Sequence, residues 1–460
     1  MMHDNAYPRR PAVSDGPPAR AATAMPFTVY TERSLDAIPQ LARLAPAARE
    51  AMRVVAQVLP FRVNRYVVDE LIDWSRVPED PIFQLTFPQR GMLQERDFAT
   101  IADLLRRGAD KGEVTAAARR IRRTLNPHPG SQLQLNVPTL HGAPVPGVQH
   151  KYRETVLFFP SQGQTCHSYC TFCFRWAQFV GDSTLRFAAR ESGTLHAYLR
   201  AHPEVSDLLI TGGDPLVMKT RHLRPALEAL LEPDLEHVRD IRIGTKSLTF
   251  WPHRYITDPD ADELLRVLER MNRHGKQVAL MAHYNHWQEL ETPLAREAVR
   301  RVRDTGTVIR TQAPLLAHIN DAPEVWARLW RTQVELGMVP YYMFVERNTG
   351  ARSYFEVPLA RAWEIYREAT QSVSGLARTA RGPSMSAGPG KVEVQGVADV
   401  QGERVFVLRF IQARNPDWVQ RPFFARLDPE ATWLDDLRPA FGEQAFFYED
   451  EYAAMVNAHD

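Results

Sequence analysis

The sequence predicts an α/β protein whose central part is built from parallel βα units. Six short apolar segments alternate with polar stretches of helical period, the pattern of strands joined by crossover helices. A compact group of cysteines follows the first apolar segment directly. Active sites of parallel barrels lie at the C-terminal ends of their strands, so we expect the site at that end of the sheet.

The six predicted strands lie between residues 150 and 375. They span residues 156–160, 207–211, 241–245, 277–284, 307–312 and 339–345. Polar stretches with helical period separate them, at 220–231, 260–274 and 293–304. No internal repeat of 20–50 residues interrupts this order, so one α/β domain accounts for the region.

Different sequence patterns flank the α/β region on both sides. Residues 1–25 are rich in Pro, Ala, Arg and Gly, which predicts a disordered tail. Residues 26–149 predict a helical region, with helical patterns at 41–50 and 97–106, followed by a Pro- and Gly-rich connector from 126 to 149. Residues 376–460 predict a mixed C-terminal extension with β-like runs.

Composition excludes several classes of function. The chain has 56 Lys and Arg against 55 Asp and Glu, a net charge of +1, which argues against nucleic acid or an anionic membrane as partner. No stretch approaches the roughly 20 apolar residues that cross a bilayer, and the first residues lack the apolar core of a secretory signal. We therefore expect a cytoplasmic protein with reduced thiols.

All three cysteines of the chain lie within eight residues, at Cys166, Cys170 and Cys173. Clustered thiolates select zinc, Cu(I) or iron–sulfur clusters. A structural zinc site needs a fourth ligand, and His167 inside the loop is badly placed to provide it. Three ligands on a cube of four irons leave one iron open to another molecule. A disulfide with a spare thiol and a zinc-bearing structural protein remain as alternatives.

The C-x3-C-x2-C spacing, with Phe172 before the last cysteine, resembles the radical S-adenosylmethionine (SAM) superfamily. The resemblance implies a 4Fe–4S cluster, bound SAM and a partial (βα)6 barrel. It also implies that Gly212, Gly213 and Asp214, after the second predicted strand, receive the amino group of SAM. The alternative for this motif is a plain strand-to-helix turn capped by Asp214.

Polar residues end the fourth and fifth predicted strands. His283 and Gln312 are therefore expected at the mouth of the barrel, where they are candidates to contact SAM. Phe172, next to the last cysteine, is a further candidate.

Eight segments in the same order resemble the lysine 2,3-aminomutase family. They lie at 150–158, 169–176, 211–216, 241–245, 283–286, 312–316, 319–321 and 339–342. The resemblance implies an isomerase that uses SAM, the cluster and pyridoxal phosphate (PLP) to move an α-amino group to the neighbouring carbon. It also implies an amino acid substrate and an electron donor such as flavodoxin or ferredoxin, and a homo-oligomer is compatible with it.

The family pattern suggests roles for individual side chains. Lys391, after the glycine-rich run Ser-Ala-Gly-Pro-Gly at 386–390, is the candidate for the covalent link to PLP. Arg175 matches the family residue that binds the substrate carboxylate. Lys151, Tyr152 and Arg153 are expected beside the phosphate of PLP.

Two departures from the family pattern bear on the cofactor and the substrate. Thr155 stands where the family has the second arginine of the PLP phosphate motif. Arg347, beside Glu346, and Ser384 stand where lysine-specific members use two aspartates to hold the distant ammonium group. Because a cation there repels an ammonium group, we expect an acidic or otherwise non-cationic amino acid. A radical SAM enzyme of another reaction type, without PLP, is the alternative.

Overall fold

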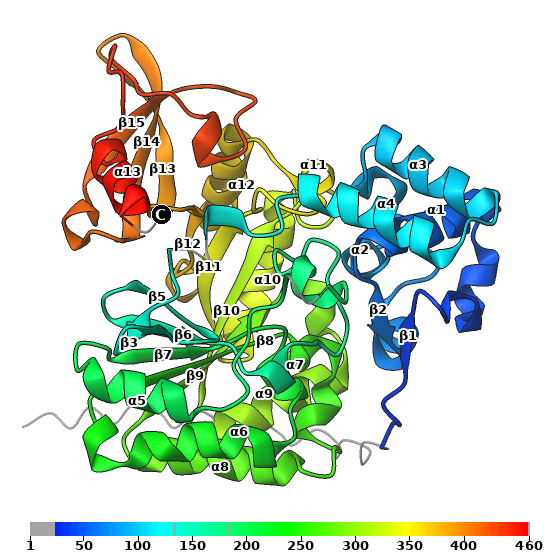
Figure 1. Ribbon diagram of the computed structural model, residues 1–460, viewed down its shortest axis with the longest axis horizontal. Coiled ribbons are helices and arrows are strands. Elements are labelled where there is room, and N and C mark those ends of the chain that lie inside the picture. Colours follow the sequence, from blue (N-terminus) through cyan, green and yellow to red (C-terminus); the bar gives the residue numbers. More distant parts are fainter. Residues whose placement is uncertain (1–23, 132–134, 183–184, 459–460) are drawn as a thin grey trace, which may run out of the picture.

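A computed structural model of the chain describes residues 24–131, 135–182 and 185–458. The predicted tail at 1–25 therefore lies almost entirely outside the described residues. The centre of the molecule is one 11-stranded sheet in the order β15-β14-β13-β12-β11-β10-β9-β8-β7-β6-β5 (Figure 1). Its strands are β5 Val148–Tyr152, β6 Thr155–Phe158, β7 Asp207–Ile210, β8 Asp240–Thr245, β9 Gln277–His283, β10 Val308–Leu315, β11 Val339–Val345, β12 Arg381–Ser386, β13 Gly390–Val400, β14 Glu403–Ala413 and β15 Pro422–Arg426.

The strands from β6 to β12 pair in parallel, each with the next. The six predicted strands correspond to β6 through β11, and β12 adds a seventh that was assigned to the C-terminal extension. The sheet ends in β5 on one side and β15 on the other, so it is an open, partial barrel. The predicted fold class is confirmed.

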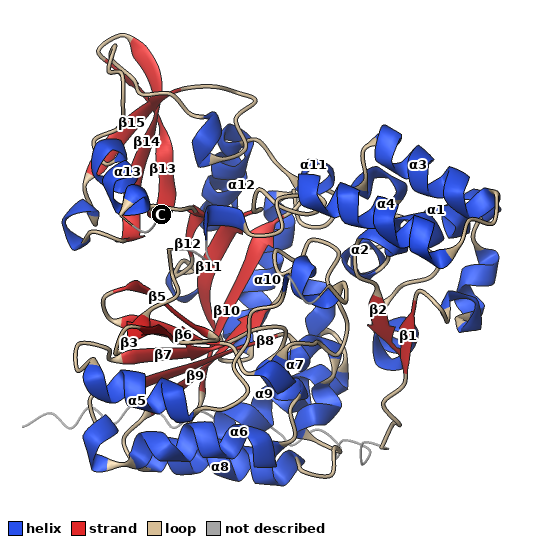
Figure 2. Cartoon of the chain, viewed as in Figure 1, coloured by secondary structure: helices blue, strands red, loops and turns tan. Residues whose placement is uncertain are grey.

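Helices cover the outer side of the parallel strands, as Figure 2 shows for α5, α6 and α8. Helix α8 illustrates why these segments are helical, because Leu264, Leu268 and Met271 recur every three or four residues and are fully buried. None of the helices in the described residues has the length and apolarity needed to cross a membrane. The helices between β6 and β12 are α5 Gly193–Ala201, α6 Thr220–Glu228, α7 Ser247–Phe250, α8 Ala261–Arg273, α9 Pro293–Asp304, α10 Pro323–Glu335, α11 Arg352–Phe355 and α12 Leu359–Gln371.

The N-terminal helical region packs around a second hydrophobic core, which it shares with residues of the cysteine loop and the barrel. It contains α1 Pro46–Val58, α2 Pro81–Thr86, α3 Glu95–Arg106, α4 Lys111–Thr124 and the strands β1 Val29–Thr31 and β2 Arg62–Asn64. The predicted start of the helix at 41–50 is wrong: α1 begins only at Pro46, and a short 3-10 turn precedes it. Proline restricts the preceding residue to extended conformations, so Pro46 starts a helix instead of continuing one.

The C-terminal extension continues the same sheet. Strands β12 to β15 pair in antiparallel order, and Lys391 lies opposite Ser386 and Gln412. Helix α13 Glu449–Asn457 packs beside this sheet, and the short hairpin of β3 Thr139–Leu140 and β4 Ala143–Pro144 lies before β5. The β12–β13 turn, with the candidate Lys391, is therefore a direct extension of the barrel edge.

Candidate active site

The loop that carries the cysteines, at residues 161–175, follows β6 and is held from two sides. The amide N–H groups of Tyr169 and Thr171 donate to the carbonyl groups of Arg62 and Leu85 in the N-terminal region, at 2.8 and 2.9 Å. On the other side, the N–H groups of Gly213 and Asp214 donate to the carbonyl groups of Gly163 and Thr165, at 3.0 and 2.7 Å. The main chain thus fixes this cysteine loop at the C-terminal end of the barrel.

The three thiols lie close enough to influence one another and are free. Burial raises the pKa of Cys166 well above 9.0, with Asp214 and the other two cysteines adding to the effect. Burial also raises the pKa of Cys173 to about 11. Three such thiolates need strong positive charge beside them, which the irons of a cluster provide.

The donor set fits a cluster better than a single ion. Within the described ranges, no three His, Cys, Asp or Glu side chains converge closely enough to hold one metal ion. The cysteines of an iron–sulfur cube bind separate irons, so they need not converge on one point. Phe172 is 7% exposed and packs in the core of the N-terminal region, where it anchors the loop. A contact between Phe172 and SAM stays a prediction.

The Gly-Gly-Asp motif forms the surface on which the cysteine loop rests. A Cβ atom at Gly213 would lie 2.3 Å from the carbonyl oxygen of Thr165, and one at Gly212 would lie 2.1 Å from Nε2 of Gln164. The close approach of the two main chains therefore requires glycine at 213, and the positive φ of 146° favours glycine at 212. Their contact with SAM stays a prediction.

The carboxylate of Asp214 ties the ends of β7 and β8 together. The Thr245 hydroxyl lies 2.8 and 2.9 Å from its two oxygens, and the N–H groups of Leu216 and Lys246 donate to it at 2.9 Å each. The side chain is 2% exposed, and three N–H or O–H groups donate to its two oxygens. These bonds are those of a capped turn, and the contact of Asp214 with the amino group of SAM stays a prediction.

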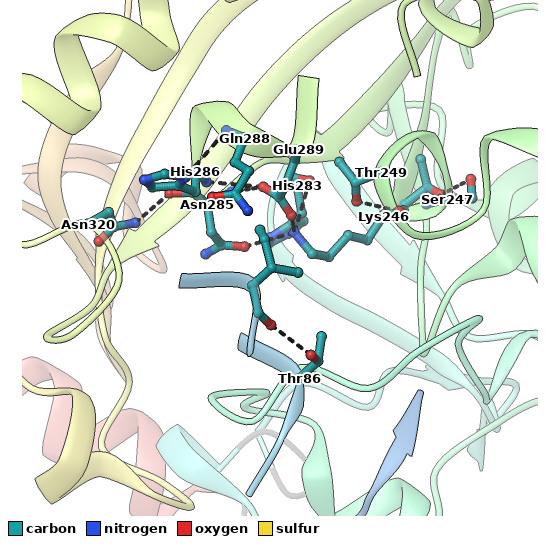
Figure 3. A network of polar contacts seen from close by, with 12 residues as sticks. Thr86, Lys246, Ser247, Thr249, His283, Asn285, His286, Gln288, Glu289 and Asn320 are labelled. Atoms are coloured by element: carbon teal, nitrogen blue, oxygen red, sulfur yellow. Dashed lines mark hydrogen bonds and ion pairs between the residues drawn. The ribbon is translucent and has the colours of Figure 1, made fainter. Parts of the chain in front are cut away.

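Behind the cysteine loop lies a polar network that includes His283 and Gln312. The Nε2 atoms of these two side chains are 2.9 Å apart, and burial lowers the pKa of His283 to about 3, so its imidazole is neutral. Figure 3 shows Lys246 extended toward Asn285 and Glu289; its Nζ donates to their side-chain oxygens at 2.9 and 2.5 Å.

Sequence reasoning missed the buried Lys246–Glu289 ion pair. Burial raises the pKa of Cys170, and the nearby charge of Lys246 lowers it, so Lys246 lies within electrostatic reach of that thiol. The available signal was the position of Lys246 directly after the predicted strand at 241–245, where polar side chains reach the barrel mouth.

Arg175 is buried and Arg347 is half-buried next to this site. Arg175 is 7% exposed, lies over the ring of Phe159 at 4.3 Å and donates to Oε1 of Gln164 at 3.1 Å. Arg347 lies over the ring of Phe174 at 4.9 Å. The Nε atoms of both guanidinium groups are buried without a partner, which is the condition of a group that awaits an anion.

One carboxyl group, that of Glu346, follows next to Arg347 in this site. Glu346 is 5% exposed, and burial raises its pKa well above 4.5 against the opposing effect of the charge of Arg347. The hydroxyl oxygen of Ser384 and Nδ1 of His128 are also buried without a partner. Burial lowers the pKa of Arg175 and of Arg347 to about 10 each. The surroundings thus offer hydrogen-bond donors to a negatively charged group.

Lys391 is a buried amine on β13. Its Nζ lies over the ring of Tyr342 at 4.3 Å and donates to Oε1 of Gln412 at 3.1 Å. Burial, with the charges of Arg242 and Arg381, lowers its pKa to about 7. A large part of this amine is neutral at neutral pH and can attack an aldehyde, as attachment of PLP requires.

Of the three residues expected beside a phosphate, two lie among the cations of this site and one does not; their contact with a phosphate stays a prediction. Lys151 is half-buried near Lys391, and its Nζ donates to the carbonyl oxygen of Ala387 at 2.5 Å. Tyr152 is close to Arg347, whose charge lowers its pKa while burial raises it. The prediction for Arg153 is wrong, because this side chain is exposed in the turn between β5 and β6. Instead, of the neighbouring charges, that of Arg414 has the largest effect on the pKa of Lys151. No sequence motif indicated Arg414.

Five cations thus gather around this site. We call Lys151, Arg175, Arg347, Lys391 and Arg414 the cationic cluster. The charges of Arg414, Arg347 and Lys391 all lower the pKa of Lys151, and Arg347 and Arg175 lie within each other's influence. The residues therefore fit a cluster with SAM on one side and a phosphorylated aldehyde with an acidic ligand on the other.

The comparisons with known proteins point to one family. The chain is 38% identical over 396 residues to a protein of Aquifex aeolicus (strain VF5) described as a "putative L-lysine 2,3-aminomutase", covering 86% of this chain and 92% of that protein. It is 25% identical over 366 residues to the L-lysine 2,3-aminomutase of Bacillus subtilis (strain 168), covering 80% of this chain and 67% of that protein.

The other two comparisons add less. A radical SAM methyltransferase from Sphaerobacter thermophilus aligns with a TM-score of 0.35 and 17% identity, over 51% of this chain and 68% of that chain. No family model matches the sequence.

Proposed function

Because this chain belongs to the lysine 2,3-aminomutase family of radical SAM enzymes, we propose that it is a PLP-dependent 2,3-aminomutase for an acidic amino acid. Membership in an enzyme family sets aside the zinc-bearing structural protein. One observation carries the proposal for the substrate: the Nε atoms of Arg175 and Arg347 are both buried without a hydrogen-bond partner.

The cofactors supply the difficult chemistry, and the side chains orient and charge-match their ligands. When bound, the cluster with SAM supplies a radical that removes a hydrogen atom, and PLP carries the migrating amino group. Cys166, Cys170 and Cys173 would hold the cluster. Lys391 would hold PLP, since its lowered pKa leaves the amine free to react. An electron donor such as flavodoxin or ferredoxin would reduce the cluster.

Arg175 lies beside the cysteine loop and would bind the α-carboxylate of the substrate. Its guanidinium group has donors in a fixed fork that matches a carboxylate. The aromatic ring of Phe159 below it limits its movement and excludes water from one face. This position would keep the carbon that loses hydrogen close to the cluster end of the site.

Charge balance favours a dicarboxylic substrate. Apart from Lys391, the cationic cluster has four positive charges when Lys151 is protonated. The phosphate of PLP contributes a charge of about −2, and a dicarboxylic amino acid adds two carboxylates, for a total near −4. Lysine would instead bring its ammonium group against Arg347, and like charges in a buried site cost several kcal/mol. Arg347, with Ser384 and His128 as further polar neighbours, would bind the distal carboxylate.

A substrate screen with an Arg347 variant tests this proposal. Anaerobically reconstituted enzyme with SAM, PLP and a reductant is given glutamate, aspartate or lysine, and β-amino acids and 5′-deoxyadenosine are measured. We expect a dicarboxylic amino acid to be the best substrate. Arg347→Met should lower its kcat/KM by about 10- to 100-fold, the loss expected for a hydrogen bond to a charged group.

The matched control is Arg361→Met, which removes an exposed arginine of α12. It should leave kcat/KM unchanged for every substrate. Turnover of lysine faster than of both dicarboxylic amino acids by the unmodified enzyme would refute the charge argument. Formation of 5′-deoxyadenosine without any need for PLP would favour a radical SAM enzyme of another reaction type.

A further inference from the structure

Arg414 of the C-terminal extension binds the turn between β12 and β13, to which Lys151 also binds. Nε of Arg414 donates to the carbonyl oxygen of Gly388 at 2.9 Å, and its Nη2 donates to Oδ1 of Asn136 at 2.6 Å. Nζ of Lys151 donates to the carbonyl oxygen of Ala387 at 2.5 Å. Two cations, distant in sequence, thus bind consecutive carbonyl groups of one turn, which leads directly to Lys391.

Both cations keep hydrogen-bond donors to spare. An ammonium group has three N–H donors and a guanidinium group has five. Lys151 has a single hydrogen bond among the described residues. Arg414 donates to oxygens of Gly388, Leu135 and Asn136 and contacts the Tyr452 hydroxyl, which leaves at least one of its five N–H groups for a ligand. No ion pair of the described residues includes either side chain. Lys151 is also desolvated, and burial with the charge of Arg414 lowers its pKa well below 10.5. An anion with several acceptor oxygens would satisfy both groups at once.

The packing of the extension fixes the turn and Arg414 together. A Cβ atom at Gly388 would lie 2.2 Å from the hydroxyl of Tyr452 on α13, and one at Gly390 would lie 2.4 Å from the carbonyl oxygen of Gln412 on β14. The glycine run is therefore shaped by contact with the extension. Arg414 lies directly after β14, where it contacts the same turn and the same tyrosine, Tyr452.

The positions at which the family pattern expects a second cation do not provide one. The Thr155 hydroxyl donates to Oδ2 of Asp207 at 2.7 Å, so it is engaged within the barrel. Arg153 is exposed in the turn beyond it. Without a second cation, the single positive charge of Lys151 would have to balance a phosphate dianion.

We propose that Arg414 and Lys151 together bind the phosphate group of PLP, with Arg414 in the role that Thr155 and Arg153 do not fill. The ligand chemistry is that of a phosphate monoester whose aldehyde end reaches Lys391. A guanidinium group provides paired donors to two phosphate oxygens, and the ammonium group adds a point charge. This inference rests on the proposed PLP dependence.

Binding of three ligands to the full-length, PLP-free protein tests the proposal. PLP has a phosphate and an aldehyde, pyridoxal has only the aldehyde, and 4′-deoxypyridoxine 5′-phosphate has only the phosphate. Affinities are measured by calorimetry or ligand fluorescence. We expect Arg414→Met to weaken binding of both phosphorylated ligands by about 10- to 100-fold and to leave pyridoxal binding unchanged. The affinity of Arg414→Lys for the phosphorylated ligands should lie between the affinities of the unmodified protein and of Arg414→Met.

The control variant is Arg404→Met, on an exposed position of the same strand β14, which should bind all three ligands normally. Equal weakening of pyridoxal and PLP by Arg414→Met would assign Arg414 a structural role and overturn the inference, as would unchanged PLP affinity. If the unmodified protein forms no lysine adduct with PLP at all, the proposed function fails. If it forms the adduct but Arg414→Met does not discriminate between ligands, only this inference fails.

Discussion

Lys391 has a pKa that falls in the physiological range. Burial and two arginines lower it from 10.5 to about 7, so the neutral, reactive fraction increases as the pH rises through 7. We expect the rate of adduct formation with pyridoxal to rise between pH 6 and 8 and then level off. Pyridoxal is used because the phosphate of PLP itself titrates near pH 6.

Absorbance of the lysine adduct after mixing measures this rate, and Lys391→Ala should abolish it. A rate that continues to rise up to pH 10 would show that the amine keeps its ordinary pKa. Lys219, which is exposed, provides a matched variant, and Lys219→Ala should leave the pH profile unchanged.

At the scale of single residues, sequence reasoning succeeded where one short segment contains the chemistry. The cysteine triplet and Lys391 after its glycine run are of this kind. It failed where the fold brings a distant side chain to the site, as with Arg414, which lies more than 260 residues from Lys151 in the chain. It also failed for Arg153, because the direction of a side chain in a turn depends on where the strand pairing ends.

At the scale of elements, the main chain of the cysteine loop approaches the Gly-Gly-Asp turn too closely for a side chain at Gly213. A Cβ atom at Gly213 would lie 2.3 Å from the main-chain oxygen of Thr165, and main chain cannot rotate away as a flexible side chain can. We expect Gly213→Ala to displace the cysteine loop, lower iron content after anaerobic reconstitution and destabilise the fold by about 1–3 kcal/mol.

Gly193→Ala is the matched control, because a Cβ atom there meets nothing within 4 Å and the residue begins helix α5. This variant should keep full iron content and unfold at the same temperature or slightly higher. Normal iron content in Gly213→Ala would show that the two loops separate without consequence for the cluster site.

Strands were predictable where both faces of the sheet are covered and the sequence is continuously apolar. That condition holds best for β6, β7 and β9, while β8 and β10 keep buried residues at alternate positions. It does not hold for β12, which reads Arg-Gly-Pro-Ser-Met-Ser and contains glycine and proline, residues that argue against a central strand. Its pairing comes from β11 and β13 on either side, which no local pattern reveals.

At the scale of the whole molecule, the cysteine loop lies between the barrel and the N-terminal region. Phe172 of this loop, and Trp176 directly after it, belong to the same hydrophobic core as α1 and α3. The contacts are hydrogen bonds between main-chain groups about 85 to 107 residues apart, such as Tyr169 to Arg62, and these leave no signature in the sequence. The N-terminal helices were predictable as helices, but their role as a support for the metal site was not.

Asn64 at the end of β2 is the side chain that connects the N-terminal region to both the loop and the barrel. It is fully buried, its Nδ2 donates to the carbonyl oxygens of Phe250 and His167 at 2.7 and 3.3 Å, and its Oδ1 accepts from the N–H of Val67 at 3.1 Å. Asn64→Ala would leave these three buried groups without partners. We expect a loss of about 2–4 kcal/mol in the free energy of unfolding, measured in denaturant, and reduced iron content.

Thr100→Ala serves as the control for Asn64→Ala, since this exposed residue of α3 makes only a hydrogen bond within its own helix. It should change stability by less than about 0.5 kcal/mol and leave iron loading intact. Unchanged iron content in a destabilised Asn64→Ala would separate the two effects and show that the N-terminal region stabilises the fold without positioning the thiols. A joint loss of stability and iron is the result expected if the region acts as one side of a clamp on the cysteine loop, because both consequences then follow from a single set of broken hydrogen bonds.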